Sequence, residues 1–158
     1  MSNITAKEIQ EIRNETGLGV MDIKNAMEEA GGDREKAMEI LKKSVGDKME
    51  KRSGRATSQG KVGVYLHGDG KSAVMVEVNC ETDFVAKADD FQNFVKDLCL
   101  HIIAMKPANI EELLKQDFVK DSKNTVGDLL KGIIAKTGEN IVISRFVIYS
   151  IGEDTISC

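Results

Sequence analysis

The spacing of apolar residues along this chain changes once, near Lys61, from a helical period to a period of two. Before Lys61, apolar residues recur every three or four positions, which is typical of amphipathic helices. From Lys61 onward, Val62, Val64 and Leu66 alternate with other residues, as residues do along a β-strand. The sequence therefore predicts an α+β protein, in which a helical part precedes a core that contains a sheet.

The part before the change predicts a three-helix module over residues 1–46. Thr5 and Glu8 have the spacing of a capping box, which satisfies free N–H groups at a helix start. Glycines separate the helical segments, and Asp33 is a favourable N-cap for the third of them. Residues 47–60 are mostly polar, and we expect them to form a linker or an exposed, frayed helix.

Residues 61–153 predict a core domain made of a small antiparallel sheet packed with helices. Two alternating segments flank a turn sequence at 68–70 and should pair as an antiparallel hairpin. The rest of the domain follows from helical spacing and a final run of β-branched residues, with helices expected at 89–105, 110–115 and 125–136 and a strand at 141–151. Residues 154–158 are expected to form a short tail.

The composition argues against several classes of function. The formal charge of -4 gives no basic excess, so we expect no direct contact with nucleic acid. The three cysteines form no CxxC pair, which predicts neither a disulfide framework nor a zinc site, and no cofactor is expected. No apolar run approaches the roughly 20 residues that span a bilayer, so we expect a cytoplasmic protein that does not bind membranes.

An enzyme with a cysteine nucleophile is the first catalytic alternative. Cys80 lies at the end of a predicted strand, and His67 and His101 are the only histidines, so a Cys–His pair is formally possible. Cys80 and His101 each have a simpler interpretation as structural residues of the interior. The sequence also lacks a P-loop and the HExxH pattern. We therefore expect a protein that acts by binding, with no catalytic residue and no metal ligand of its own.

The connection over residues 79–87, between a predicted strand and the long helix, combines two acidic residues with an aromatic one. Connections of this kind often carry function, because their backbone is exposed. Phe84 has two interpretations: a ring folded onto the chain's own core, or a ring presented to a partner with Asp83 bonding beside it. Presented aromatic side chains often carry a large share of a binding energy.

The same connection closely resembles a signature of the elongation factor Ts family. Three further segments resemble that family, in the family's order, and the four together cover most of the chain. These segments are residues 79–86, 16–24, 91–105 and 134–146.

The resemblance implies a guanine-nucleotide exchange factor that binds elongation factor Tu in its GDP-bound and nucleotide-free states. It implies that one loop displaces Mg²⁺ from the GTPase and distorts its nucleotide site, through Thr82, Asp83, Phe84 and Val85. It also implies further partner contacts in the helical module and on the core, at Val20, Met21, Lys24, His67, Thr137 and Gly138. Thr137 stands where an aliphatic residue is common in the family.

The resemblance is to short, single-core members of the family, which implies a homodimer that offers contacts from both subunits. A different class of function remains open, because the three-helix module is similar to ubiquitin-associated (UBA) domains in size and in its glycine-containing first loop. As a UBA-like adaptor, the chain would bind peptides or ubiquitin-like partners instead of a GTPase.

Overall fold

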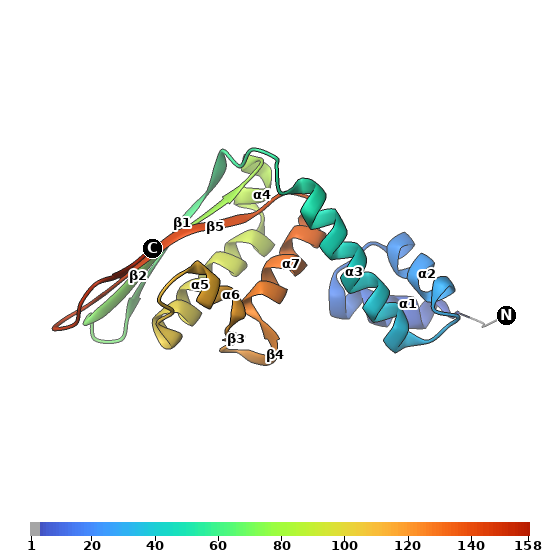
Figure 1. Cartoon of the computed structure of the whole chain (residues 1–158), viewed down its shortest axis with the longest axis horizontal. Helices are drawn as coiled ribbons and strands as arrows, with labels where there is room; N and C mark the ends of the chain where they lie inside the picture. Colours follow the sequence, from blue (N-terminus) through green and yellow to red (C-terminus); the bar gives the residue numbers. More distant parts are fainter. Residues whose placement is uncertain (1–3) are drawn as a thin grey trace.

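The computed structural model describes residues 4–158 and has an elongated shape (Figure 1). A module of three helices lies at one end, and an α+β core lies at the other. The module consists of α1 (Ala6–Thr16), α2 (Val20–Glu29) and α3 (Arg34–Arg52). The α+β class and the order of a helical module before a sheet-containing core, both predicted from the sequence, are confirmed.

The helical module has its own small interior, because each helix turns one apolar face inward. Ile12 of α1, Ile23 and Met27 of α2 and Leu41 of α3 are all buried in one cluster. The predicted capping box opens α1: the Thr5 hydroxyl accepts from the Glu8 N–H at 3.3 Å, and the Glu8 carboxylate accepts from the Thr5 N–H at 2.8 Å. These reciprocal bonds satisfy two N–H groups that the helix itself leaves free.

Helix α3 runs from the module to the core without a break. It continues through residues 47–52, a stretch for which the sequence left open a linker or an exposed helix. Met49 packs against the core, and the Arg52 guanidinium donates to the carbonyl of Ile134 at 3.4 Å. The extension is therefore helical, and its last two turns touch the core.

The core sheet has the strand order β1-β2-β5-β6, with antiparallel neighbours throughout. Strands β1 (Gln59–His67) and β2 (Ser72–Cys80) form the predicted hairpin, whose tip is closed by a hydrogen bond from the Gly70 N–H to the His67 carbonyl. Strand β5 (Val142–Ser150) pairs with β2, and β6 (Ile156–Ser157) pairs with β5. The expected tail thus holds a short edge strand.

Helices cover only one face of this sheet (Figure 1). They are α5 (Asp89–Met105), α6 (Ile110–Lys115) and α7 (Val126–Thr137), within one residue of the predicted bounds. Val74, Val76 and Val78 of β2 are buried against the apolar stripe of α5. Besides β6, three short elements were not predicted: α4 (Asp83–Lys87), β3 (Asp117–Phe118) and β4 (Asp121–Thr125).

Strand β1 turns its three aliphatic residues away from the core. Val62, Val64 and Leu66 are each more than half exposed, while Gly63 between them faces α5. A side chain at position 63 would overlap Val95 and Cys99 of α5, so glycine allows the strand and the helix to approach closely. The alternation seen in the sequence therefore marks the outer face of the sheet.

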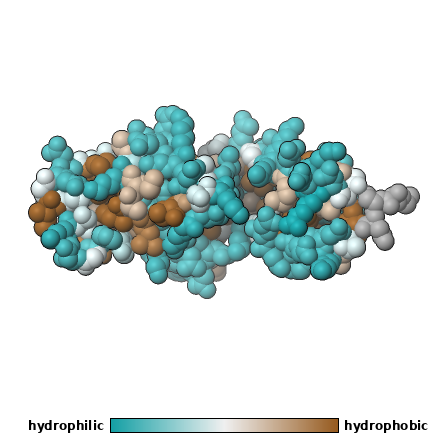
Figure 2. All heavy atoms as spheres, turned by 90° about the horizontal axis from the view of Figure 1, so that it is seen from below, coloured by the Kyte–Doolittle hydropathy of each residue, from teal (hydrophilic) through white to brown (hydrophobic). Residues whose placement is uncertain are grey.

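The opposite, helix-covered side of the molecule is mainly hydrophilic, with hydrophobic groups gathered over the core half (Figure 2). Over residues 4–158, every helix is either too short or too polar to cross a bilayer.

Candidate partner-binding site

The loop over residues 81–85 leaves the end of β2 and turns at once into the short helix α4. Thr82 caps this helix, because its hydroxyl accepts from the Val85 N–H at 3.4 Å and its backbone is extended. Val85 and Ala86 point inward and anchor α4 on the core. Phe84, one position earlier, is 85 % exposed. The interpretation of Phe84 as a ring folded onto its own core is therefore excluded.

The carboxylate of Glu139 holds this loop from the side. One of its oxygens accepts from the N–H groups of Glu81 and Thr82, at 3.0 and 3.1 Å, and the other accepts from the Thr82 hydroxyl at 2.5 Å. In return, the Glu81 carboxylate accepts from the Asn140 N–H at 2.6 Å. Gly138 ends α7 in the left-handed region, with φ of 72°, and so turns the chain toward the loop.

The end of α3 joins the same corner of the molecule. The Asn140 side-chain amide donates to the carbonyls of Ser53 and Arg55, at 3.4 and 2.9 Å. The Arg55 guanidinium also lies 3.6 Å from the Glu81 carboxylate. Figure 1 shows α4, the end of α3 and the start of β5 meeting here. The exit from the helical module, the 81–85 loop and the α7–β5 turn are thus tied together.

The predicted residues on this corner differ in how free they are to meet a partner. The exposed Asp83 carboxylate pairs with Lys87, one turn along α4, at 3.1 Å. Exposed pairs of this kind are weak, so Asp83 can exchange Lys87 for a partner group. Thr137 is half-buried, and its hydroxyl donates to the Ile133 carbonyl at 2.8 Å. Thr137 and Gly138 directly precede Glu139, the residue whose carboxylate bonds to Thr82.

The other predicted residues lie elsewhere. Val20 and Met21 are exposed on α2, at 40 % and 64 %, and Lys24 on the same helix pairs with Glu28 at 3.8 Å. His67 is exposed at the tip of the β1–β2 hairpin, where Ser72 is its cross-strand partner. Ser72, at this tip, and Cys80 are eight residue steps apart along β2, a distance of about 27 Å. The structure therefore presents three separate surfaces.

The geometry does not assemble a cysteine nucleophile with a histidine base among the residues that the structure describes. Cys80 and Cys99 are buried, and burial raises the pKa of both thiols, that of Cys99 to about 11. His101 is buried and engaged elsewhere: its Nε2 lies 2.9 Å from the Gln116 side-chain oxygen, and its Nδ1 accepts from the Val119 N–H. Residues 4–158 also contain no group of three side chains placed to hold a metal ion.

The sequence did not single out Glu81, Glu139 or Asn140 as functional residues. The hydrogen bonds that join them to the loop and to the end of α3 link positions 57 to 87 apart, so no local pattern reveals them. One signal could have pointed to them. Polar residues follow Gly138 directly, and a glycine at a helix end predicts a turn that places the next side chains at the surface.

Comparisons with known proteins place these features in a family. The family model described as elongation factor TS matches residues 81–157. Elongation factor Ts of Geobacter metallireducens is 41% identical over 196 aligned positions, which cover 96% of this chain and 91% of that protein. Elongation factor Ts of Caldanaerobacter subterraneus is 39% identical, with 95% of this chain and 98% of that protein covered.

A third relative, elongation factor Ts of Trichlorobacter lovleyi, is 47% identical over 147 residues, which cover 93% of this chain and 47% of that protein. The alignment with the first relative is longer than the 158 residues of this chain, so that relative has residues with no counterpart here. The matches extend over both the helical module and the core. The chain belongs to the elongation factor Ts family.

Proposed function

We propose that this chain is a guanine-nucleotide exchange factor for elongation factor Tu and acts in the cytoplasm by binding, without covalent chemistry. Membership of the elongation factor Ts family supports the role and the partner. The single observation that carries the mechanism is the 85 % exposure of Phe84 on a loop whose backbone is clamped at Glu81 and Thr82. A large apolar ring held in water by a fixed backbone is suited to enter a partner.

The chemistry of a bound nucleotide explains why such a ring can release it. A GTPase holds GDP through backbone N–H groups around the phosphates and through Mg²⁺, the largest local charge in the site. A second protein speeds release only if it binds the distorted, emptied site better than the filled one. Phe84 would wedge beside the metal site, and Thr82, Asp83 and Val85 would shape the loop that displaces Mg²⁺.

We propose that the helical module, residues 1–46, acts as a docking unit beside the core domain, residues 61–153. Val20 and Met21 would contact the nucleotide-binding domain of the GTPase, because their apolar side chains are exposed on α2. Lys24 would exchange its weak pair with Glu28 for an acidic group of the partner. His67, Thr137 and Gly138 would supply the contacts from the core.

We further propose that the chain forms a homodimer through the outer face of its sheet. Cross-strand pairing arranges this outer face in three rows, which are Val62–Glu77–Arg145, Val64–Met75–Val147 and Leu66–Ala73–Tyr149. Five of these apolar side chains are exposed by 48 to 66 %, namely Val62, Val64, Leu66, Met75 and Tyr149. A contiguous apolar face of this kind is typical of an interface.

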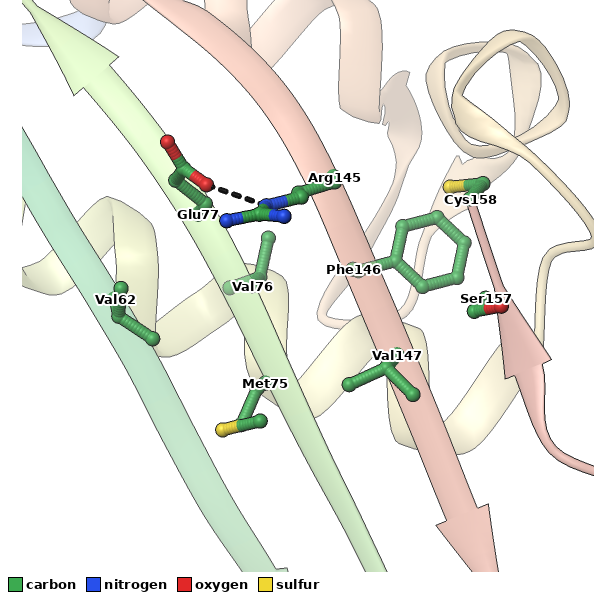
Figure 3. A pocket seen from close by; sticks show the side chains of 9 residues that line it. All are labelled: Val62, Met75, Val76, Glu77, Arg145, Phe146, Val147, Ser157 and Cys158. Carbon is green, nitrogen blue, oxygen red and sulfur yellow. Dashed lines mark hydrogen bonds and ion pairs between the residues drawn. The ribbon is translucent and has the colours of Figure 1, made fainter.

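The charges on the outer face fit a second copy of the same chain. Arg145 donates to the Glu77 carboxylate at 2.6 Å beside a hollow of about 530 Å³ (Figure 3). In a two-fold interface each patch meets itself, so a neighbouring pair of opposite charges can bond across the axis to its own copy. The apolar outer face, with a self-complementary ion pair at one end, therefore favours a second copy of the chain as the partner that covers it.

The proposed function is tested by the release of fluorescent GDP from elongation factor Tu. We expect the chain to accelerate release at concentrations well below that of the GTPase, since each molecule acts repeatedly. Release at the spontaneous rate, with a folded chain in excess, would exclude the proposal.

The Mg²⁺ step has its own test, because coupling between two ligands is reciprocal. If the loop displaces Mg²⁺, raising the Mg²⁺ concentration must weaken binding of the chain to the GDP-bound GTPase. Calorimetric titrations at low and high Mg²⁺, with ionic strength held constant, measure this. Equal affinities at both concentrations would remove Mg²⁺ displacement from the mechanism.

A further inference from the structure

Glu139 stands outside the set of residues that would touch the GTPase, yet its carboxylate makes three hydrogen bonds to the loop that would do so. We propose that Glu139 is a positioning residue, which holds Thr82 and thereby fixes the placement of Phe84. The proposal rests on the proposed exchange function and adds a residue to it.

The first argument is the direction of the hydrogen bonds around the Thr82 hydroxyl. An ionised carboxylate can only accept, so the hydroxyl must donate its proton to Glu139. The lone pairs of the hydroxyl oxygen then remain free to accept a hydrogen bond from the Val85 N–H, in the first turn of α4. Glu139 thus fixes the orientation of the Thr82 hydroxyl, which caps the helix that carries Phe84.

The second argument is that the Phe84 side chain has little support of its own. Its ring is 85 % exposed, so the direction in which it points is set by the backbone of residues 82–85. That backbone is tied down at Glu81 and Thr82 by the two N–H groups that share one Glu139 oxygen. Hydrogen bonds to an ionised acceptor are roughly twice as strong as those between neutral groups.

The third argument is that Glu139 is itself held in place. The Asn140 N–H, in the next peptide unit, donates to Glu81 at 2.6 Å, and the Asn140 side chain bonds Ser53 and Arg55. The loop and the turn therefore brace each other in both directions. A carboxylate on a braced turn can maintain a loop geometry that an exposed loop would otherwise lose.

The substitution Glu139→Gln tests the proposal with almost no change in size. A glutamine offers one acceptor oxygen, and its NH₂ group can only donate, so it cannot accept from both the Thr82 hydroxyl and the two N–H groups as the carboxylate does. Glu111→Gln is the matched control, because Glu111 is an exposed residue of α6 whose carboxylate pairs with Lys115 at 2.6 Å, away from the loop. Both variants remove one negative charge.

The first measurement uses the free chain and does not depend on any partner. We expect amide hydrogen exchange at Glu81 and Thr82 to be faster by about tenfold or more in Glu139→Gln, while amides of β2 and α5 are unchanged. The control should match the parent chain throughout. Unchanged protection of the Glu81 and Thr82 amides in Glu139→Gln would overturn the proposal, whether or not the chain is an exchange factor.

The second measurement is a double-mutant cycle on GDP release from elongation factor Tu. Glu139→Gln should lower the maximal release rate by about tenfold, because a small misplacement of a contacting group has large effects. If Glu139 acts by placing Phe84, adding Glu139→Gln to Phe84→Ala should cost little more than Phe84→Ala alone. Fully additive effects would overturn the proposal. A parent chain that fails to accelerate release would instead overturn the exchange function and leave the first measurement standing.

Discussion

Gly63 of β1 lies directly against Val95 of α5, so that a side chain at position 63 would overlap the valine methyl group. Because Gly63 faces the helix, its neighbours Val62 and Val64 must face the other side of the sheet. Both are more than half exposed there. The close contact of Gly63 with α5 thus fixes which face of β1 points outward, and so places the two valines on the outer face of the sheet.

We expect Val64→Lys to weaken or abolish the proposed homodimer, because it would bury an unpaired charge in the middle row of the outer face. Sedimentation equilibrium of the parent chain and the variant measures the change. Val119→Lys is the control, since Val119 is 47 % exposed in the connection between β3 and β4, outside the outer face. A parent chain that sediments as a monomer at high concentration would contradict the dimer proposal.

Phe84→Ala should lower the rate of GDP release from elongation factor Tu by roughly 10- to 100-fold, as expected for an aromatic anchor. Its effect on the free energy of unfolding should stay within about 0.5 kcal/mol, because the ring is exposed and buries little surface. Stopped-flow release of fluorescent GDP and urea unfolding measure the two effects. Val119→Ala serves as a control for loss of an exposed apolar side chain. A variant that accelerates release normally would rule out the wedge.

Lys24→Ala should weaken docking on the GTPase by about 0.2–1 kcal/mol, the range measured for many exposed ion pairs. Calorimetric titration with nucleotide-free elongation factor Tu checks this. Lys36→Ala is the matched control, because Lys36 is an exposed lysine of the same module that pairs with Asp33. Equal affinities for the parent chain and Lys24→Ala would remove this contact from the proposed surface.

We expect one thiol of the folded chain to react rapidly with a disulfide reagent at pH 8. Cys158 is exposed, whereas Cys80 and Cys99 are buried and their pKa values are raised, chiefly by burial, so little thiolate is present. Three thiols should react after unfolding in denaturant. Rapid reaction of Cys80 in the folded chain would show that the strand end beside Thr82 opens.

The stability of the chain should fall as the pH drops below about 6.5, partly because of His101. Burial lowers the pKa of this histidine in the folded state, although its hydrogen bond with Gln116 opposes the shift. Between the folded and the unfolded pKa, the unfolded chain binds the proton more readily, so acid favours unfolding. The contribution is complete above about pH 6.5 and is lost as the pH falls toward the folded pKa.

Urea unfolding at pH 7.5 and 5.5 checks this expectation. The loss of stability between the two pH values should be smaller in His101→Gln than in the parent chain, even though the variant is less stable by about 1–3 kcal/mol at pH 7.5. Parallel pH dependence of the two chains would contradict the assignment to His101.

Much of the fold could be predicted because its helices and hairpin have strong local signals. The stripe that includes Phe91 and Leu98 gives the bounds of α5 directly. Helix α4 was missed because five residues are too few to show a period, and it forms because Thr82 caps it and Ala86 is buried. Strand β4 was missed because its residues 121–125 are polar, so no apolar alternation marks it.

The loop that forms the candidate site could be proposed from the sequence, but its internal support could not. The residues around Phe84 were identified from their sequence, and the sequence left open whether the ring faced inward or outward. That choice depends on contacts such as Glu139 with Thr82, which join parts of the chain 57 residues apart. Only the packing of α7 and β5 beside the loop brings these groups together.

Helix α3 spans 19 residues, or about 28 Å, and its last turns rest on the core. It therefore works as a rod that sets both the distance and the orientation of the helical module relative to Phe84. Each residue added to the rod would rotate the module by about 100°, whereas a full turn lengthens it with little rotation. If the module docks on the GTPase as proposed, the number of residues in α3 is a geometric parameter of that docking, separate from the identity of any contacting side chain.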